Sequence, residues 1–201
     1  MYKKLRLSAK ERKQQLTNVA RTVFAAKGFQ GTRTKDIAIA AGVSEATLFR
    51  FFKNKDEIYD AIFNTTVKKH SKTNIYEKFK GKNFQTILNG FILQVIENNE
   101  KDPSFLRLML YSSLEEHKLV TNFIESNVNE EEKEFIKIIE NGMKVGEYRN
   151  VNPKLTAQLF HYLVGGYCIE RFILRENKNE TISNEEVAEI MTDILLNGLK
   201  I

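Results

Sequence analysis

The residues with side chains for catalysis or metal binding are few and widely spaced. The three histidines are His70, His117 and His161, and no two stand four residues apart, the spacing that places two zinc ligands on one helical face. The one cysteine, Cys168, excludes an internal disulfide and an all-cysteine metal site. His161 and Cys168 lie seven residues apart, which favours a shared core or ligand cavity over thiol chemistry. Because no glycine-rich phosphate loop or converging nucleophile and base is present, we expect no catalytic residue, no metal, no cofactor and no enzyme.

The charged residues are divided unevenly along the chain. The net charge is +5, but residues 1–55 contain 13 lysines and arginines against 3 acidic residues, whereas residues 56–201 contain 18 against 23. The first quarter is therefore cationic by +10 and the rest is acidic by −5. A basic segment of this kind indicates a polyanionic partner for the first quarter of the chain.

The overall composition is 42% hydrophobic and 28% charged, the balance of an ordinary folded protein. The longest apolar stretch, residues 159–169, is interrupted by His161 and is shorter than the ~20 residues of a membrane-spanning helix. The basic start lacks the apolar region of a signal peptide, because Ser8 and several charged residues follow it. We therefore expect a cytoplasmic protein with no membrane partner.

The spacing of apolar residues predicts helices throughout. They recur mostly three and four apart and only two prolines interrupt the chain, which indicates an all-α fold of about nine helices. The first helix begins with the capping-box spacing of residues 8–11 and ends at Gly28. Thr32 or Thr34 caps a short second helix, and Ser44 caps a third. Further helices are expected from Asn54 or Lys55, over residues 84–98, from Asp102-Pro103 to about 114, over 118–143 as one helix or two that break at Asn129, from Asn152-Pro153 to about Glu176, and after Ser183.

The second and third helices have the dimensions of a helix-turn-helix. Residues 40–44 join them in the basic quarter, and Gly42 permits the sharp turn. Leu48 and Phe52, four residues apart, form the inward face of the third helix. The alternative is an ordinary helical hairpin with a solvated basic face. The residues turned outward, where a major groove would meet them, are Ala46, Thr47 and Arg50, with Glu45 and Phe49 beside them.

Three segments in this region have a more specific pattern. They are FAAKGF at 24–29, TRTKDIA at 32–38 and AGVSEATLFRFFKNK at 41–55. With them, residues 12–63 resemble the DNA-binding domain of the TetR family of bacterial transcriptional regulators. The sequence GMKVGEYR followed by VNP, within residues 142–153, is similar to the stretch before the penultimate helix in many members.

The resemblance implies both an architecture and a function. It implies a three-helix, helix-turn-helix DNA-binding domain at residues 9–69 and a larger helical ligand-binding and dimerisation domain at residues 70–201. The expected protein is a homodimeric repressor that a small effector releases from a palindromic operator in double-stranded DNA. Effector binding would displace the helix that begins at Asn54 or Lys55 and change the separation between the two DNA-binding domains of the dimer. The alternatives are an activator, a regulator without a small effector, an architectural DNA-binding protein and, least favoured, an enzyme that uses the C-terminal cavity.

The resemblance also assigns DNA contacts by position. Glu45 either accepts a hydrogen bond from a cytosine amine or repels the wrong register. Arg50 has the donors to bind guanine with two hydrogen bonds. The residues placed along the phosphates are Thr32, Arg33, Thr47, Phe49, Phe51 and Lys55; those facing base edges are Ser44, Glu45, Ala46 and Arg50; Thr34 and Lys35 complete the predicted set.

Three positions depart from the family pattern. Ala46 stands where glycine is common, Phe49 where tyrosine is common, and Phe51 where histidine or tyrosine is common. Because both phenylalanines lack a polar group for a phosphate, backbone contact would depend more on basic side chains. These are Arg33, Lys35, Lys53, Lys55 and an arm formed by Lys3, Lys4 and Arg6, which is equally well explained as a disordered start.

The helix that begins at Pro153 is apolar on all sides, which predicts burial on two sides. One side would pack within its own subunit, and the other would pack, with the last helix, against the same pair in a second copy. The alternative is a single thick monomeric core. The predicted interface residues are Leu155, Leu159, Leu163, Gly166, Ile190 and Ile194.

Aromatic and apolar residues of the middle helices are candidates for an effector pocket. Any single residue of this kind is more often plain core than pocket. Their apolar character, with tyrosine and histidine as polar groups, favours a hydrophobic or aromatic effector over a phosphorylated sugar. The predicted set is Phe91, Val95, Phe105, Met109, Tyr111, Phe123, Met143, His161 and Tyr162.

Overall fold

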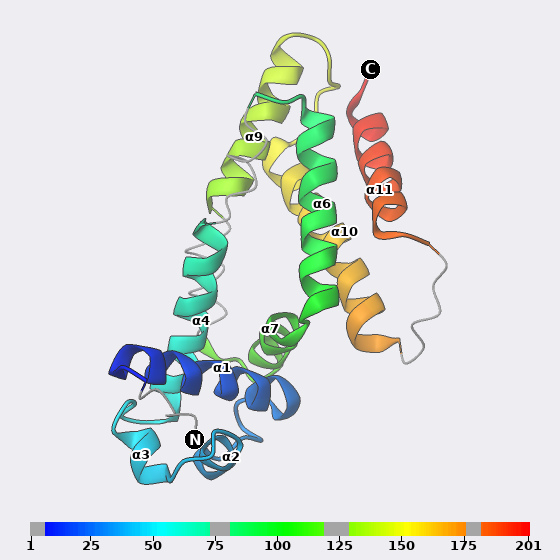
Figure 1. The fold of residues 1–201 in the computed structure, drawn as a ribbon. Coiled ribbons are helices and arrows are strands. Elements are labelled where there is room, and N and C mark those ends of the chain that lie inside the picture. The colour runs from blue at the N-terminus through cyan, green and yellow to red at the C-terminus, as the bar shows by residue number, and fades with distance from the viewer. Residues whose placement is uncertain (1–6, 73–80, 119–128, 176–181) are drawn as a thin grey trace, which may run out of the picture. The chain divides into compact units, whose positions relative to one another are not determined.

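The computed structural model describes residues 7–72, 81–118, 129–175 and 182–201. Within these ranges the chain forms nine α-helices, one π-helical turn and an isolated β-bridge between Tyr148 and Lys200 (Figure 1), which confirms the predicted all-α class. The helices are α1 (Ala9–Lys27), α2 (Thr34–Ala40), α3 (Glu45–Phe49), α4 (Lys55–Lys72), α6 (Phe84–Lys101), α7 (Ser104–Leu114), α9 (Asn129–Lys144), α10 (Pro153–Ile169) and α11 (Asn184–Leu199), and the π-turn is η1 (Glu170–Leu174).

The chain folds as two compact units. The first contains residues 1–69 and 104–123, and the second contains residues 70–103 and 124–201. The predicted domain boundary between residues 69 and 70 coincides with one of the points where the chain passes between units. Helix α7 packs with the first unit although the predicted DNA-binding domain ended before it.

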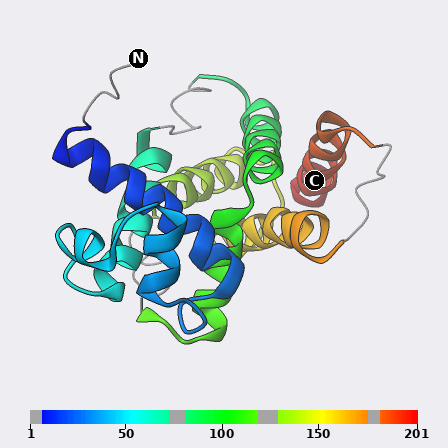
Figure 2. The ribbon, with the colours of Figure 1, turned by 60° about the horizontal axis from the view of Figure 1, so that its bottom comes forward.

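The ends of the first helix form as their sequence predicts. The backbone N–H of Ser8 donates to the Glu11 carboxylate at 2.8 Å, and the N–H of Glu11 donates to the Ser8 hydroxyl at 3.3 Å. Gly28 ends the helix with φ 73° and ψ 177°, a backbone conformation that is essentially restricted to glycine. Helix α1 then packs against both α2 and α7 (Figure 2).

The cap of α2 differs from its prediction, whereas the cap of α3 agrees with it. Thr34 is the first residue of α2 and Thr32 lies outside it, so neither threonine caps the helix; the Asp36 carboxylate instead accepts from the N–H of Arg33 at 3.3 Å. Ser44 caps α3 as predicted, since its hydroxyl accepts from the N–H of Thr47 at 3.1 Å.

Side chains from five helices form the core of the first unit. Helices α1, α2, α3, α4 and α7 all contribute, so this unit has a single hydrophobic core of its own. Leu48 and Phe52 are both buried in it, which confirms the predicted inward face of the third helix. The core residues are Leu16, Ala20, Phe24, Ala25, Ile37, Ala38, Leu48, Phe52, Ile58, Tyr59, Ile62, Phe63 and Leu108.

In the second unit α11 packs along α6, and α10 packs against α9 and α6. The predicted cap-and-proline start of α10 is present, because the Asn152 side chain accepts from the N–H of Leu155 at 3.0 Å. The helix expected to continue to about Glu176 is α-helical only to Ile169 and then continues as the π-turn η1. The fresh helix start considered at Asn129 is the start of α9, and residues 119–128 lie outside the described residues.

The two glycines with positive φ around α2 allow a matched test of the packing in this unit. Gly28→Ala would place a Cβ 2.5 Å from Oε1 of Glu115 and 2.8 Å from the Tyr111 ring, whereas Gly42→Ala, at φ 64°, meets nothing within 4 Å. We expect Gly42→Ala to cost about 1–2 kcal/mol of unfolding free energy from its backbone conformation alone. Gly28→Ala should cost about 2 kcal/mol more, because overpacking is added to the backbone strain. Urea denaturation measures both, and equal losses would contradict the close packing at Gly28.

Candidate nucleic-acid interface

Helix α3 presents one buried and one open face. Leu48 lies fully in the core, while Ser44, Ala46 and Arg50 are exposed and Phe49 is 45% exposed. The residues predicted to turn outward therefore do so, although Thr47 is half-buried. Its hydroxyl shares a hydrogen bond of 2.9 Å with that of Ser44, the residue that caps the helix.

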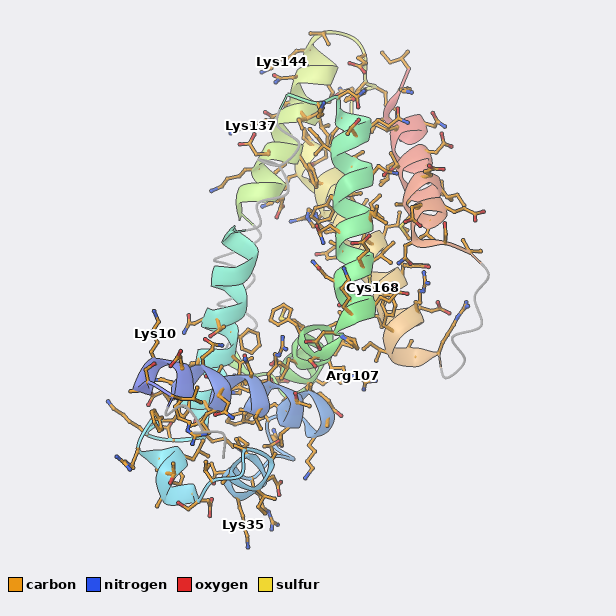
Figure 3. The ribbon with its side chains drawn as sticks, viewed as in Figure 1. Lys10, Lys35, Arg107, Lys137, Lys144 and Cys168 are labelled. Carbon is orange, nitrogen blue, oxygen red and sulfur yellow. The ribbon has the colours of Figure 1, made fainter. Side chains whose placement is uncertain are left out.

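Exposed basic side chains lie before and after α3 in the sequence. Arg33, Lys35 and Lys53 are exposed, and Lys35 projects from α2 away from the rest of its unit (Figure 3). Lys27 is paired with Asp36 at 3.1 Å, and the hydrogen bond from Lys27 and the one from the Arg33 N–H both lower the pKa of the Asp36 carboxyl. This acidic group is thus ionised and bonded locally, which leaves the neighbouring basic groups to set the sign of the surface.

Two predicted phosphate contacts have other roles in the structure. Thr32 is buried, and its hydroxyl donates to the Gly28 carbonyl at 2.7 Å, so its side chain holds the α1–α2 loop rather than facing a phosphate. Phe51 is half-buried and packs against the core of the first unit. The sequence predicted both from position alone, and local packing decides against a direct contact by these side chains.

Lys55 is tied to the same loop. Its ammonium donates to the carbonyls of Phe29 and Thr32 at 2.9 and 3.1 Å and lies 4.2 Å from the centre of the Phe29 ring. An ammonium has three N–H donors, so one remains for a phosphate. Lys55 therefore positions the loop before α2, and a phosphate contact by its third donor stays a prediction.

A residue that the sequence did not single out completes this loop. The Glu115 carboxylate, just beyond the end of α7, accepts from the backbone N–H groups of Phe29 and Gln30 at 2.9 and 3.1 Å. These two amides precede α2 and would otherwise lack partners, and the absence of a Cβ at Gly28 lets the carboxylate approach. No sequence signal identifies the pair, because 86 positions separate Glu115 from Phe29.

An aromatic cluster links α1, α4 and α7 beneath the loop. The Tyr59 ring contacts those of Phe24, Phe29 and His117 with centroid distances of 4.8, 5.1 and 5.0 Å. Its hydroxyl shares a 2.6 Å hydrogen bond with that of Ser112, and burial raises the pKa of Tyr59, so the phenol stays protonated. The cluster fixes α7 to the two helices that support the helix-turn-helix.

The second unit contains an apolar pocket between α6, α9, α10 and α11. None of the nine predicted pocket residues lines it; its lining is Phe84, Leu88, Phe135, Ile139, Thr156, Ala157, Phe160, Leu195 and Leu199. Patterning cannot separate these positions from plain core, because helix packing alone determines where space remains.

The predicted pocket residues fall into several groups. Phe91 and His161 pack against each other with a centroid distance of 5.4 Å and contact the rings of Phe135 and Phe160, which line the pocket. Val95 and Met143 are half-buried in the same unit. In the first unit Phe105 and Met109 pack on the core and Tyr111 contacts Gly28, while Tyr162 is exposed and Phe123 lies outside the described residues.

The chemistry available elsewhere is limited in the part of the chain that the structure describes. No group of three or more His, Cys, Asp or Glu residues is arranged to hold a metal ion there. Burial raises the pKa of the Cys168 thiol to about 11, so it stays protonated near neutral pH and is a poor nucleophile. No helix in the same ranges is long and apolar enough to cross a membrane.

Two family models match the chain, one near its N-terminus and one in its C-terminal half. Residues 16–62 match the model described as bacterial regulatory proteins, tetR family, and residues 93–196 match that of the AefR-like transcriptional repressor C-terminal domain. The chain belongs to the TetR family. Helices α2 and α3 are thus the helix-turn-helix of a TetR-family DNA-binding transcriptional regulator, as the sequence predicted.

Individual known proteins are similar to this chain over nearly its whole length. The HTH-type transcriptional regulator LuxR of Vibrio harveyi is 29% identical over 198 residues, which cover 94% of this chain and 90% of LuxR. The solved structure of the ketosteroid transcriptional regulator KstR2 of Mycobacterium tuberculosis has a TM-score of 0.71 at 18% identity and covers 98% of this chain and 97% of its own. AibR, solved with isovaleryl coenzyme A and operator DNA, has a TM-score of 0.73 at 17% identity, and the match covers 92% of this chain and 98% of the AibR chain.

The tie between α7 and the loop before α2 can be tested with two neighbouring glutamates. Glu115→Gln replaces one acceptor oxygen by an amide that faces a backbone N–H, so we expect a loss of about 1–3 kcal/mol of unfolding free energy in urea. The exposed Glu116→Gln keeps every described hydrogen bond and should change stability by less than about 0.5 kcal/mol. Equal stability of the two variants would show that the carboxylate is dispensable.

Proposed function

We propose that this TetR-family regulator is a homodimeric repressor that binds a two-fold symmetric operator and is released by a small hydrophobic effector. The observation that carries the proposal is the open face of α3, which carries an exposed Arg50 and is preceded and followed in the sequence by exposed basic residues. Lysines and arginines that neutralise phosphates release counterions and give affinity without sequence preference. An exposed arginine on the recognition helix adds preference, because it can donate two hydrogen bonds to one guanine.

Phosphate contact in this proposal comes mainly from Arg33, Lys35 and Lys53. All three are exposed, whereas the side chains of Thr32 and Phe51 are committed to the fold. Lys55 contributes through the one donor that its two carbonyl bonds leave over. The helix-turn-helix therefore binds the backbone through charge more than through hydroxyl groups.

The proposed dimer interface is the open side of α10 and α11. Ala157, Phe160, Val164 and Cys168 bury the other side of α10 within its own unit. Both helices pack on α6, and exposed apolar side chains grouped on such helices are typical of a surface that another protein covers. Gly165 and Gly166 have open space where a Cβ would stand, which suits close approach of a second backbone. The exposed apolar residues are Leu155, Leu159, Tyr162, Leu163, Ile190 and Ile194, which include five of the six predicted interface residues.

The proposed effector site is the apolar pocket of the second unit. Its lining is almost entirely aromatic and aliphatic, which favours a hydrophobic ligand. Its free volume is about 10 Å³, the space of a single water, so a ligand has to move the lining side chains apart to enter. The ketosteroid in the name of KstR2 is of this class, whereas the isovaleryl coenzyme A in the AibR complex joins a short apolar acyl group to a charged, phosphorylated carrier. The chain passes between units within α4 and between α6 and α7, so we propose that ligand binding acts on the helix-turn-helix through these connections. The proposal includes no catalytic step. The protein would act on chromosomal DNA in the cytoplasm.

The two kinds of DNA contact can be separated by matched alanine variants. Arg50→Ala should lower affinity for a duplex selected from random sequence by about tenfold or more while leaving affinity for random duplex nearly unchanged. Lys35→Ala should weaken both equally and reduce the slope of log affinity against log salt by about 1. Fluorescence anisotropy titrations at several salt concentrations measure all four affinities. Equal losses on both duplexes from Arg50→Ala would contradict base reading by this residue.

The dimer surface can be tested by placing one charge in it. Leu159 is 56% exposed on α10, and we expect Leu159→Glu to give the sedimentation mass of a single chain at micromolar concentration, because an uncompensated charge would be buried in the interface. Val145, 76% exposed after α9, provides the control, since Val145→Glu should leave the mass of two chains. A single-chain mass for the unmodified protein, or two chains for both variants, would refute this interface.

A further inference from the structure

Glu45 is an unusual residue to find on a surface proposed to bind DNA. The first 55 residues contain three acidic side chains, and the other two are engaged away from α3. Glu11 accepts from Ser8 at the start of α1, and Asp36 is paired with Lys27. Glu45 is the first residue of the recognition helix and is next to the exposed Ala46, where its negative charge would be repelled by phosphates.

The Glu45 carboxylate is held in a defined orientation. Oγ1 of Thr34, the first residue of α2, lies 2.7 Å from Oε1 of Glu45. Because an ionised carboxylate only accepts hydrogen bonds, the hydroxyl of Thr34 is the donor and its one proton is committed to Glu45. The second oxygen, Oε2, has no hydrogen-bond donor among the described residues. The side chain is half-buried, so its position depends on this bond and on packing rather than on solvent.

The turn between α2 and α3 is already closed without this bond. The N–H of Val43 donates to the Ala38 carbonyl at 3.0 Å, Gly42 adopts positive φ, and Ser44 caps α3. A glutamine would accept the same bond from Thr34 without adding negative charge at the DNA surface. A role in joining α2 to α3 therefore explains the hydrogen bond to Oε1 of Glu45. It does not explain why the side chain is charged or what its second oxygen binds.

We propose that Glu45, oriented by Thr34, determines specificity by accepting a hydrogen bond from the exocyclic amine of cytosine in the major groove. This inference rests on the proposed function. At the same position guanine presents O6 and N7 and thymine presents O4, all of them acceptors, which an acceptor-only carboxylate excludes. Adenine also presents an amine, N6, but sets it beside the acceptor N7, which repels a carboxylate, so cytosine is favoured over all three other bases. Thr34 acts as a positioning residue, and its hydroxyl is not a phosphate contact. Repulsion by phosphates weakens binding to every sequence, and the hydrogen bond restores affinity only where the amine is present.

The test compares the sequences that full-length variants select from random duplex DNA. The unmodified protein should select cytosine at one position of each half-site. Glu45→Gln should lose that preference by about tenfold or more, because its amide donates as well as accepts. Glu116→Gln removes the same charge from an exposed position outside the helix-turn-helix and should leave the selected sequence unchanged. Thr34→Val should weaken the preference, and Thr34→Ser, which keeps the hydroxyl, should restore it.

The outcomes separate this inference from the proposed function. If Glu45→Gln, at an unchanged melting temperature, selects the same base as the unmodified protein at every position, the carboxylate is only a tie between α2 and α3 and the inference is wrong. If the unmodified protein selects no common sequence, the proposed function fails first and this inference fails with it. If Glu45→Gln lowers the melting temperature, Thr34→Val and Thr34→Ser decide, since equal cytosine preference in these two variants also overturns the proposal.

Discussion

The recognition helix depends entirely on packing, because it is too short to hold its own conformation. Helix α3 has five residues, whereas isolated helices shorter than ~12–15 residues are marginal in water. Its orientation comes from Leu48 and Phe52, which are buried in a core that α1, α2, α4 and α7 also build. The direction in which Arg50 and Glu45 project is therefore a property of the whole first unit, and anything that disturbs this core disturbs DNA reading.

Helix α7 gives that core an unexpected connection. It follows α6 in the sequence, yet its residues pack with α1 and α4, and Glu115 closes the loop that leads into α2. The loop also receives Lys55 from the start of α4, so α4 and the segment after α7 both hold the residues just before the helix-turn-helix. Both segments continue into the second unit along the chain. In the proposed function, a ligand that changed either segment would therefore act on the same few hydrogen bonds at Phe29, Gln30 and Thr32.

The sequence could predict the helix caps and buried faces that depend on residues a few positions apart. It could not predict the contacts and the pocket that depend on residues far apart in the chain. The caps at Ser8, Ser44 and Asn152 involve partners three residues away, and the inward position of Leu48 follows from helical periodicity. The burial of Thr32 and the pocket at Phe135 and Phe160 depend on how helices from different parts of the chain meet. The predicted α2 cap failed for a related reason, since Thr32 bonds backward to α1's final turn and Asp36 takes the capping role.

The most direct test of the central claim is whether the open face of α3 contacts DNA. A photoreactive phenylalanine placed at position 49, which is 45% exposed on α3, can be crosslinked to a duplex selected by the unmodified protein, with the same group at position 145 in the second unit as reference. The account predicts strong crosslinks from position 49 to one base pair of each half-site, weak ones to random duplex at physiological salt, and none from position 145. Equal yields from the two positions, or none from position 49 under conditions where the protein binds, would contradict it.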